Sequence, residues 1–293
     1  MTQRIGLILT TLLLLGLAPS APAGSDAPNL ASVHAAIGAA NNQELIHSKH
    51  ADVGVPIASL TKLMTALVVM ESEQPLDEWL TVVERRKEPP NNAYTRIRLG
   101  SRLQRGELLR LALMSSENMA AHVLASHHPG GRDAFVARMN ETATRLGMTN
   151  SHFVDPSGLS ADNRASALDM LALARAAYQH QPIREYSTTT YRRARFRSPP
   201  YALEYGNTNP LVSYGSWPVT LSKTGYLKEA GRCLAMVTRI DGRPIAMVLL
   251  NSFGTRSPIG DAGRVRRWMR NGTTGHVAKA AREYEQRQSA RFE

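Results

Sequence analysis

Pro56-Ile-Ala-Ser-Leu-Thr-Lys-Leu-Met-Thr-Ala-Leu, residues 56–67, is the stretch around which the rest of the chain is organised. Pro56 favours an extended or turn conformation, so a helix is predicted to begin near Ala58 or Ser59. Ser59 and Lys62 are three residues apart, which places their side chains on one face of that helix. The apolar residues around them predict a buried helix.

This pairing predicts a nucleophile and its base. Burial disfavours the charged form of Lys62 and lowers its pKa from about 10.4. A neutral amine beside the Ser59 hydroxyl can then accept its proton. The Ser59 N–H lies at the positive end of the helix and can serve as an oxyanion donor. The alternative is a helix-capping serine followed by a surface lysine, and this short motif alone does not exclude it.

Length and composition describe an ordinary globular protein. The chain has 293 residues, 43% hydrophobic and 20% charged, enough for one large domain or two small ones. The formal net charge of +11 favours anionic partners. The densest basic run is Arg192-Arg-Ala-Arg-Phe-Arg197, which is interpreted as a solvated loop or an edge strand.

The N-terminus resembles a secretory signal peptide. Arg4 precedes the apolar run at residues 5–17, and Ala21-Pro-Ala23 offers a cleavage site, so residues 1–23 are predicted to be removed. An uncleaved signal anchor is the alternative. For an exported chain, envelope polymers or a membrane surface are more plausible anionic partners than nucleic acid. Cys233 is the single cysteine, so we expect a buried core thiol and no internal disulfide. No metal-binding motif is present in the sequence, and no cofactor is expected.

The order of elements predicts an α/β fold. Expected strands are Val33–Ile37, Glu44–His47, Leu80–Val83, Val219–Ser222, Arg232–Ile240 and Pro244–Leu250. Expected helices are Ser59–Met70, Gln104–Met114, Met119–Ser126, Asp133–Leu146, Ser166–Gln179 and Ile259–Arg270. Residues 87–92 and 181–216 are expected to be irregular, and the charged tail from Gly275 partly helical. The terminal strands are expected to share one antiparallel sheet with the helices beside it, and the cleft to lie where the two meet.

Ser116-Glu-Asn118 interrupts two buried helices, so its polar groups need partners or a ligand. Ser116 can relay the proton from Lys62 to a departing amine. The amide of Asn118 can hydrogen-bond a substrate and hold Lys62 in place. The alternative is that this segment only caps the following helix.

Lys223-Thr-Gly225 supplies the far wall of the predicted site. Lys223 would bind a terminal carboxylate or bias the serine relay, and Thr224 would add a hydroxyl donor to the same anion. Gly225 lets the strand edge approach a ligand because it has no Cβ. The N–H of Tyr226 would be the second oxyanion donor. The alternative for Lys223 is a sheet-edge lysine that discourages aggregation.

Together these segments resemble the low-molecular-mass penicillin-binding proteins, the serine D-alanyl-D-alanine carboxypeptidase family, over roughly residues 30–272. The resemblance rests on residues 58–65, 114–121, 152–159 and 222–226, and residues 231–236 favour the periplasmic D-alanyl-D-alanine endopeptidase branch. It implies a β-lactamase/transpeptidase-like fold, with a catalytic domain at 24–274, an all-helical insert at roughly 71–215 and a charged tail at 275–293. It also implies cleavage of D-alanyl peptide bonds in peptidoglycan muropeptides through an acyl-enzyme on Ser59, and inhibition by β-lactams.

The family's usual C-terminal β-domain and amphipathic anchor have little room after Lys223, so we expect a periplasmic enzyme with at most loose membrane association. Three alternatives to the endopeptidase remain open. They are a carboxypeptidase only, a β-lactamase, and a non-catalytic module that binds wall polymer or senses β-lactams. A β-lactamase of class A would need an extra glutamate to position water, and no Glu-x-x-x-Asn-like segment occurs in residues 150–180.

Overall fold

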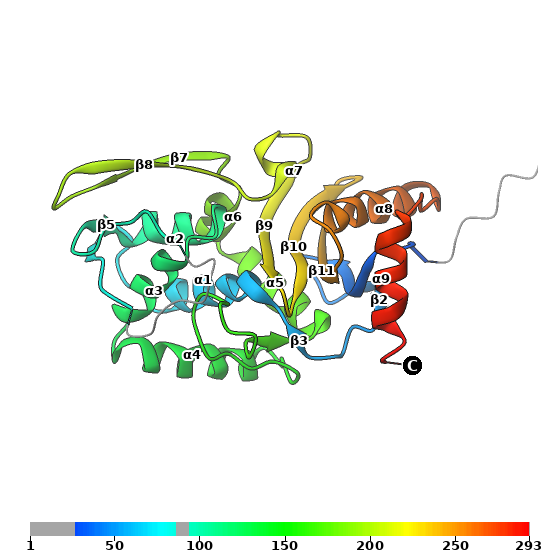
Figure 1. Cartoon of the computed structure of the whole chain (residues 1–293), viewed down its shortest axis with the longest axis horizontal. Coiled ribbons are helices and arrows are strands. Elements are labelled where there is room, and N and C mark those ends of the chain that lie inside the picture. Colours follow the sequence, from blue (N-terminus) through cyan, green and yellow to red (C-terminus); the bar gives the residue numbers. More distant parts are fainter. Residues whose placement is uncertain (1–26, 86–93, 293) are drawn as a thin grey trace, which may run out of the picture.

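The computed structural model describes residues 27–85 and 94–292. The predicted signal peptide and the predicted loop at 87–92 lie outside these residues. The described chain forms a lobe built on an antiparallel sheet and a lobe built mainly of helices (Figure 1).

One five-stranded sheet joins the two ends of the chain, as predicted. Its order is β2-β1-β11-β10-β9, and every neighbouring pair is antiparallel. Its strands are β1 (Ser32–Ala39), β2 (Leu45–Lys49), β9 (Val219–Leu227), β10 (Gly231–Ile240) and β11 (Arg243–Ser252). Asp241-Gly242 between two apolar runs is a strong local signal for a β-hairpin with a primed turn, and the turn between β10 and β11 does have positive φ at Asp241 (48°) and Gly242 (80°).

Both faces of this sheet are buried. Ala35 and Ile37 of β1 pack in one hydrophobic cluster, and Ala36 between them packs in another, because side chains alternate across a strand. Helix α8 (Ser257–Asn271) contacts β10 and β11 on one side, whereas α5 (Ala167–Gln179) contacts β1, β10 and β11 from the helical lobe. The cluster beneath α5 is continuous with the core of the helical lobe, so the two lobes share one hydrophobic core.

The helical lobe lies between β2 and β9 in the sequence. Its helices are η1 (Ala58–Leu60), α1 (Thr61–Glu71), α2 (Arg105–Met114), α3 (Asn118–Ser126), α4 (Gly131–Arg145), α6 (Gln181–Ser187) and α7 (Pro210–Ser213). It also contains short antiparallel pairs, namely β3 (Val55–Pro56) with β6 (Arg164–Ala165), β4 (Trp79–Thr81) with β5 (Arg102–Gln104), and β7 (Tyr191–Phe196) with β8 (Tyr201–Gly206). The helices predicted in this region are confirmed within a few residues.

The prediction that residues 181–216 are irregular is wrong. This segment forms α6, the β7–β8 hairpin and α7. Pro182 stands in the first turn of α6, where its missing N–H costs nothing, so this proline is compatible with a helix. In β7 the buried residues are only Ala194 and Phe196, and the arginines around them obscure the alternation.

The charged tail is partly helical, as expected. Helix α9 (Lys279–Ser289) packs against β1 and β11, and the Tyr284 hydroxyl donates to Asn251 Oδ1 at 2.6 Å. Cys233 is buried, as predicted, and burial raises the pKa of its thiol to about 12. Among residues 27–85 and 94–292, no helix combines the length and the apolar character that crossing a membrane requires.

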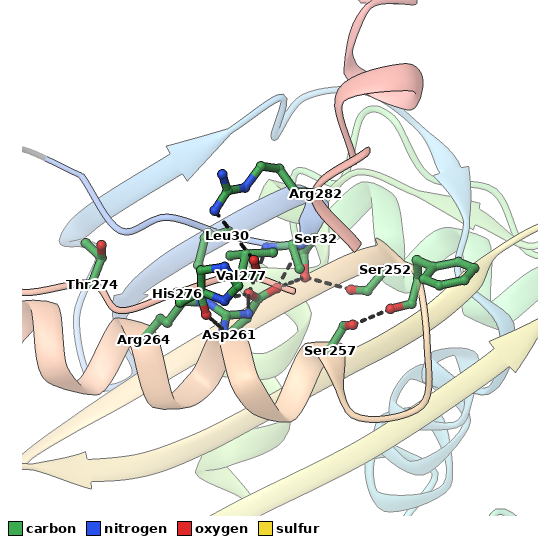
Figure 2. Close-up of polar contacts among 12 residues, drawn as sticks. Leu30, Ser32, Ser252, Ser257, Asp261, Arg264, Thr274, His276, Val277 and Arg282 are labelled. Atoms are coloured by element: carbon green, nitrogen blue, oxygen red, sulfur yellow. Dashed lines mark hydrogen bonds and ion pairs between the residues drawn. The ribbon is translucent and has the colours of Figure 1, made fainter. Parts of the chain in front are cut away.

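A buried carboxylate ties the start of the sheet to α8 (Figure 2). Asp261 is fully buried, and its oxygens accept hydrogen bonds from the N–H groups of Ala31 and Ser32 at 2.8 Å each, from the Ser32 hydroxyl and from the Arg264 guanidinium. Arg264 also donates to the carbonyl of His276 at 3.1 Å, which connects the cluster to the chain entering α9.

Replacing Asp261 with alanine is expected to lower the free energy of unfolding by about 3–5 kcal/mol. The change leaves a buried guanidinium without its counter-charge and the N–H groups of Ala31 and Ser32 without acceptors, whereas the Ser32 hydroxyl keeps Ser252 Oγ as a partner at 2.7 Å. Urea unfolding followed by circular dichroism measures the loss. Glu44→Ala is the control, because Glu44 and Arg243 form an exposed ion pair worth at most about 1 kcal/mol. Equal losses in the two variants would contradict a structural role for Asp261.

Candidate active site

Ser59 stands on a tight turn at the junction of the two lobes. The helix begins with η1 at Ala58, as predicted, and Ala58 has a φ of 49° in the left-handed region. The Thr61 hydroxyl donates to the Ala58 carbonyl at 2.8 Å and stabilises this turn. Ser59 is partly exposed while its neighbours Ala58 and Leu60 are buried, so the turn presents the serine to the outside.

The Lys62 amine is buried and points to the Ser59 hydroxyl. Its Nζ lies 3.1 Å from Ser59 Oγ, 2.7 Å from Asn118 Oδ1 and 2.6 Å from the carbonyl oxygen of Ser157. Lys62 is fully buried, so the alternative of a surface lysine is excluded. A neutral amine has two N–H donors, which the oxygens of Asn118 and Ser157 can accept, and its lone pair is then left to face the Ser59 hydroxyl.

The environment of Lys62 favours its neutral form. Burial lowers the pKa of Lys62 from 10.5 to about 7, and the negative charges of Asp155 and Glu117 oppose part of that shift. Near neutral pH a substantial fraction of this lysine is therefore a free amine. Such an amine, in contact with a serine hydroxyl, is suited to act as a general base.

The loop at 152–163 positions Lys62 and was not assigned a role from the sequence. Asp155 accepts hydrogen bonds from the N–H groups of Ser157, Gly158 and Ser160, which fold the loop into a compact turn. Asn163 Oδ1 accepts from the backbone of residues 154 and 155, and its Nδ2 donates to Asp155 O. This turn delivers the Ser157 carbonyl to Lys62. The Asp-Pro-Ser-Gly sequence signals such a turn, but not the lysine that it touches.

Gly158 shows how closely this loop packs on the nucleophile turn. It has a φ of 79°, and a Cβ at this position would lie 1.9 Å from the carbonyl oxygen of Ala58. Only glycine fits here, because any side chain would force the loop away from Ser59.

The segment Ser116-Glu-Asn118 both caps α3 and contributes side chains to the cleft. The Glu117 carboxylate caps α3 by accepting from Met119 N at 3.1 Å, whereas Ser116 and Asn118 line the cleft beside Ser59. Ser116 has a φ of 61°, an uncommon conformation for a non-glycine residue that is often found at functional sites. Burial raises the pKa of Glu117, and the backbone N–H of Met119 partly offsets that effect.

Strand β9 closes the opposite side of the cleft. A Cβ on Gly225 would lie 3.2 Å from Ser59 N and 3.0 Å from Leu60 Cδ1, so the strand passes directly beside the nucleophile turn. Thr224 contacts Thr208 through their hydroxyl oxygens at 2.6 Å. The Tyr226 side chain is 51% exposed, and the Arg232 guanidinium lies 4.0 Å from its ring centroid. The late segment predicted to form the far wall therefore does lie against the early helix.

Lys223 is buried rather than displayed at a sheet edge. Its Nζ donates to the Thr224 carbonyl at 2.7 Å. Burial first, and the charge of Lys62 second, hold the pKa of Lys223 well below its usual range. A carboxylate bound nearby would offset both effects and favour the protonated amine.

The cleft extends well beyond the predicted site residues. It has a volume of about 1570 Å³ and extends from Ser59 along the end of β9 to the start of α8. The sequence analysis missed two arginines that line its far part, Arg232 and Arg256. Nothing in a linear sequence distinguishes them from the other basic residues of this chain.

The sequence matches one protein family over most of its length. Residues 21–254 match the family described as D-alanyl-D-alanine carboxypeptidase. The D-alanyl-D-alanine endopeptidase of Pseudomonas aeruginosa is 42% identical over 255 residues, which cover 87% of this chain and 82% of that protein. The D-alanyl-D-alanine endopeptidase of Escherichia coli K12 is 43% identical over 265 residues, 90% of this chain and 86% of that protein.

Solved structures share the fold. The Streptomyces K15 DD-transpeptidase superposes with a TM-score of 0.74 at 25% identity, covering 84% of this chain and 98% of that one. Penicillin-binding protein D2 from Listeria monocytogenes, in its ampicillin-bound form, superposes with a TM-score of 0.68 at 27% identity, covering 80% and 97%. The predicted β-lactamase/transpeptidase-like fold is thereby confirmed.

Proposed function

The chain belongs to the D-alanyl-D-alanine carboxypeptidase family of serine peptidases, and from that premise we propose that it is an endopeptidase that cleaves D-alanyl cross-links in peptidoglycan. One observation carries the proposal. Ser59 lines a large cleft, and the buried Lys62 amine lies 3.1 Å from its hydroxyl. The two curated relatives at 42–43% identity are endopeptidases by name, which supports cleavage of cross-links over trimming of terminal residues.

The first half of the reaction forms an acyl-enzyme. Neutral Lys62 takes the proton of Ser59 as the serine oxygen bonds to the D-alanyl carbonyl carbon. The N–H groups of Ser59 and Tyr226 stabilise the negative charge on the carbonyl oxygen. The C–N bond then breaks, and Ser116 passes the proton from Lys62 to the departing amine. Asn118, Lys223 and Thr224 hold the substrate by its amide and carboxylate groups.

In the second half, water attacks the ester on Ser59 and releases the acid, restoring the hydroxyl. A β-lactam enters the same path, but its leaving amine stays tethered to the acyl group and blocks the cleft. The oxygens of Asp155, the loop carboxylate that acts on Lys62, are occupied by four hydrogen bonds from their own loop. This carboxylate is therefore not available to position a hydrolytic water, which argues for a long-lived adduct.

We place the mature enzyme in the periplasm, with the signal peptide at residues 1–23, a catalytic domain at 24–274 and a tail at 275–293. The family acts on wall peptide, which is found outside the cytoplasmic membrane.

Digestion of a cross-linked dimeric muropeptide and of a monomeric pentapeptide, followed by mass spectrometry, tests the proposal. We expect the dimer to be split into two monomers by the wild type and to remain intact with Ser59→Ala. Loss of D-alanine from the pentapeptide with an intact dimer would instead identify a carboxypeptidase. Rapid, repeated turnover of penicillin would identify a β-lactamase, and no product from either substrate would favour a binding module.

A further inference from the structure

A basic hairpin projects from the helical lobe. Strands β7 and β8 extend over α2 and β5, at the upper left of Figure 1. The segment at 94–102 runs beside them, because Arg102 and Arg197 exchange two backbone hydrogen bonds of 2.8 and 3.0 Å. Residues 94–102 and 191–206 together contain seven arginines and one acidic residue, Glu204. Positive charge is therefore concentrated on these two segments.

Five of these arginines are exposed and form no ion pair within the described parts of the chain. We call this group the basic arm, and its members are Arg96, Arg98, Arg193, Arg195 and Arg197. A neighbour shows the contrast. Arg192 forms a two-pronged pair with Glu107, at 2.7 and 2.8 Å. The strand alternation explains the difference, since Ala194 and Phe196 on the Arg192 side face the protein. Arg193 and Arg195 project from the opposite, outer side of β7.

Aromatic rings hold three arginines of the basic arm in place. The Arg197 guanidinium lies 3.8 Å from the Trp79 ring centroid, that of Arg98 lies 4.7 Å from Tyr201, and that of Arg96 lies 5.0 Å from Tyr205. Stacking orders a guanidinium without neutralising its charge. An anion that binds these groups therefore pays less side-chain entropy than it would on free arginines.

The basic arm is continuous with the cleft wall. Strand β8 ends at Gly206, and two residues later the Thr208 hydroxyl lies 2.6 Å from that of Thr224 beside Ser59. Ala202, which pairs with Arg195, is six residues before Thr208, so the chain places Arg195 at most about 20 Å along the hairpin from the cleft wall. A long polymer whose bond under attack lies at Ser59 can therefore reach Arg193 and Arg195 with another of its parts.

We propose that the basic arm is a second binding surface for the substrate polymer, where carboxylates of a neighbouring stem peptide of the peptidoglycan bind. This inference rests on the proposed function, because it takes its ligand from the polymer that occupies the cleft. A guanidinium group can donate two parallel hydrogen bonds to one carboxylate, and the net positive charge of the basic arm is complementary to a polyanion. A lipid surface is the competing occupant, because Tyr94, Leu99 and Tyr191 are exposed on the same two segments, and the vesicle measurement below decides between the two.

Co-sedimentation with purified, insoluble peptidoglycan sacculi tests this surface. All variants carry Ser59→Ala, so that the polymer is not degraded during the measurement. Arg193→Gln with Arg195→Gln is expected to weaken binding roughly tenfold and to flatten its dependence on salt, because two charges facing an anionic surface are lost. Both side chains lie outside every hydrogen bond and ring contact of the described residues, and unfolding curves check that the fold is retained.

The matched control is Arg287→Gln with Arg291→Gln, which removes the same charge from two exposed sites at the C-terminal end. It is expected to bind sacculi as the parent does. Equal losses in both double variants, or no loss in the arm variant, would overturn the proposal. Binding of the parent to vesicles of anionic phospholipid but not to sacculi would also overturn it. Cleavage of a soluble dimer by the wild type reports the proposed function separately, so the two proposals can fail independently.

Discussion

Replacing Ser59 with alanine is expected to lower the rate of muropeptide cleavage on the order of 10⁵- to 10⁶-fold, as loss of a nucleophile does in other serine hydrolases. The geometry offers no substitute. Ser59 is the serine that the buried Lys62 amine contacts, at 3.1 Å, and it stands where Gly225 of β9 reaches the nucleophile turn. The same variant should form no covalent adduct with penicillin, whereas the wild type should gain the mass of one intact penicillin per chain. Intact-protein mass spectrometry measures this directly.

Ser48→Ala is the matched control for this experiment. Ser48 is an exposed residue of β2, and the change removes the same hydroxyl far from the cleft. Its cleavage rate and its penicillin adduct are expected to equal those of the wild type. A full-mass adduct on the Ser59→Ala protein would show that another residue is the nucleophile.

Replacing Lys62 with methionine is expected to slow penicillin acylation by about 10²- to 10⁴-fold, the range assigned to a general base. Methionine fills the same buried space but cannot accept a proton. Lys62→Arg separates the base from a mere positive charge, because an arginine remains protonated throughout the accessible pH range. If Lys62→Arg acylates at nearly the wild-type rate, Lys62 acts through its charge and the general-base role is wrong.

The pH dependence of the wild type provides the second measurement on Lys62. Only the neutral amine can take the serine proton, and burial places its pKa at about 7. The acylation rate should therefore rise by about tenfold per unit below that pKa and level off above it. The Lys62→Met variant should lack this inflection. If the acylation rate of the wild type stays constant from pH 5.5 to 8.5, the lowered pKa of Lys62 does not control the reaction. Another group, such as Lys223, would then have to take the serine proton.

Most of the fold could be predicted from the sequence. Strands β1, β10 and β11 were predicted because their apolar runs and the Asp241-Gly242 turn are local signals. The β7–β8 hairpin was missed for a physical reason. Strand β7 has only two buried apolar residues, and four arginines lie among and beside them, so the sequence shows no clear alternation of apolar and polar residues. The buried side of the strand becomes evident only from the structure, where α2 and the segment at 94–102 lie beside it.

The candidate site was predicted unevenly. Six of the eight predicted residues line one cleft, and the other two, Lys62 and Lys223, are buried and contact lining residues. The roles assigned to them stay predictions. The sequence did not indicate that the 152–163 loop supplies the Ser157 carbonyl to Lys62. It also did not indicate that Lys223 is buried close enough to Lys62 for the charge of one to lower the pKa of the other.

The sequence by itself determined that Ser59 and Lys62 meet, because a helical turn brings residues three apart onto one face whatever surrounds them. Only the tertiary structure decided what that meeting can do. The base strength of Lys62 depends on complete removal from water, and the closed cleft depends on a strand from late in the chain passing against the first helix. Desolvation and long-range contacts come from how the whole chain packs, so no local pattern of residues encodes them.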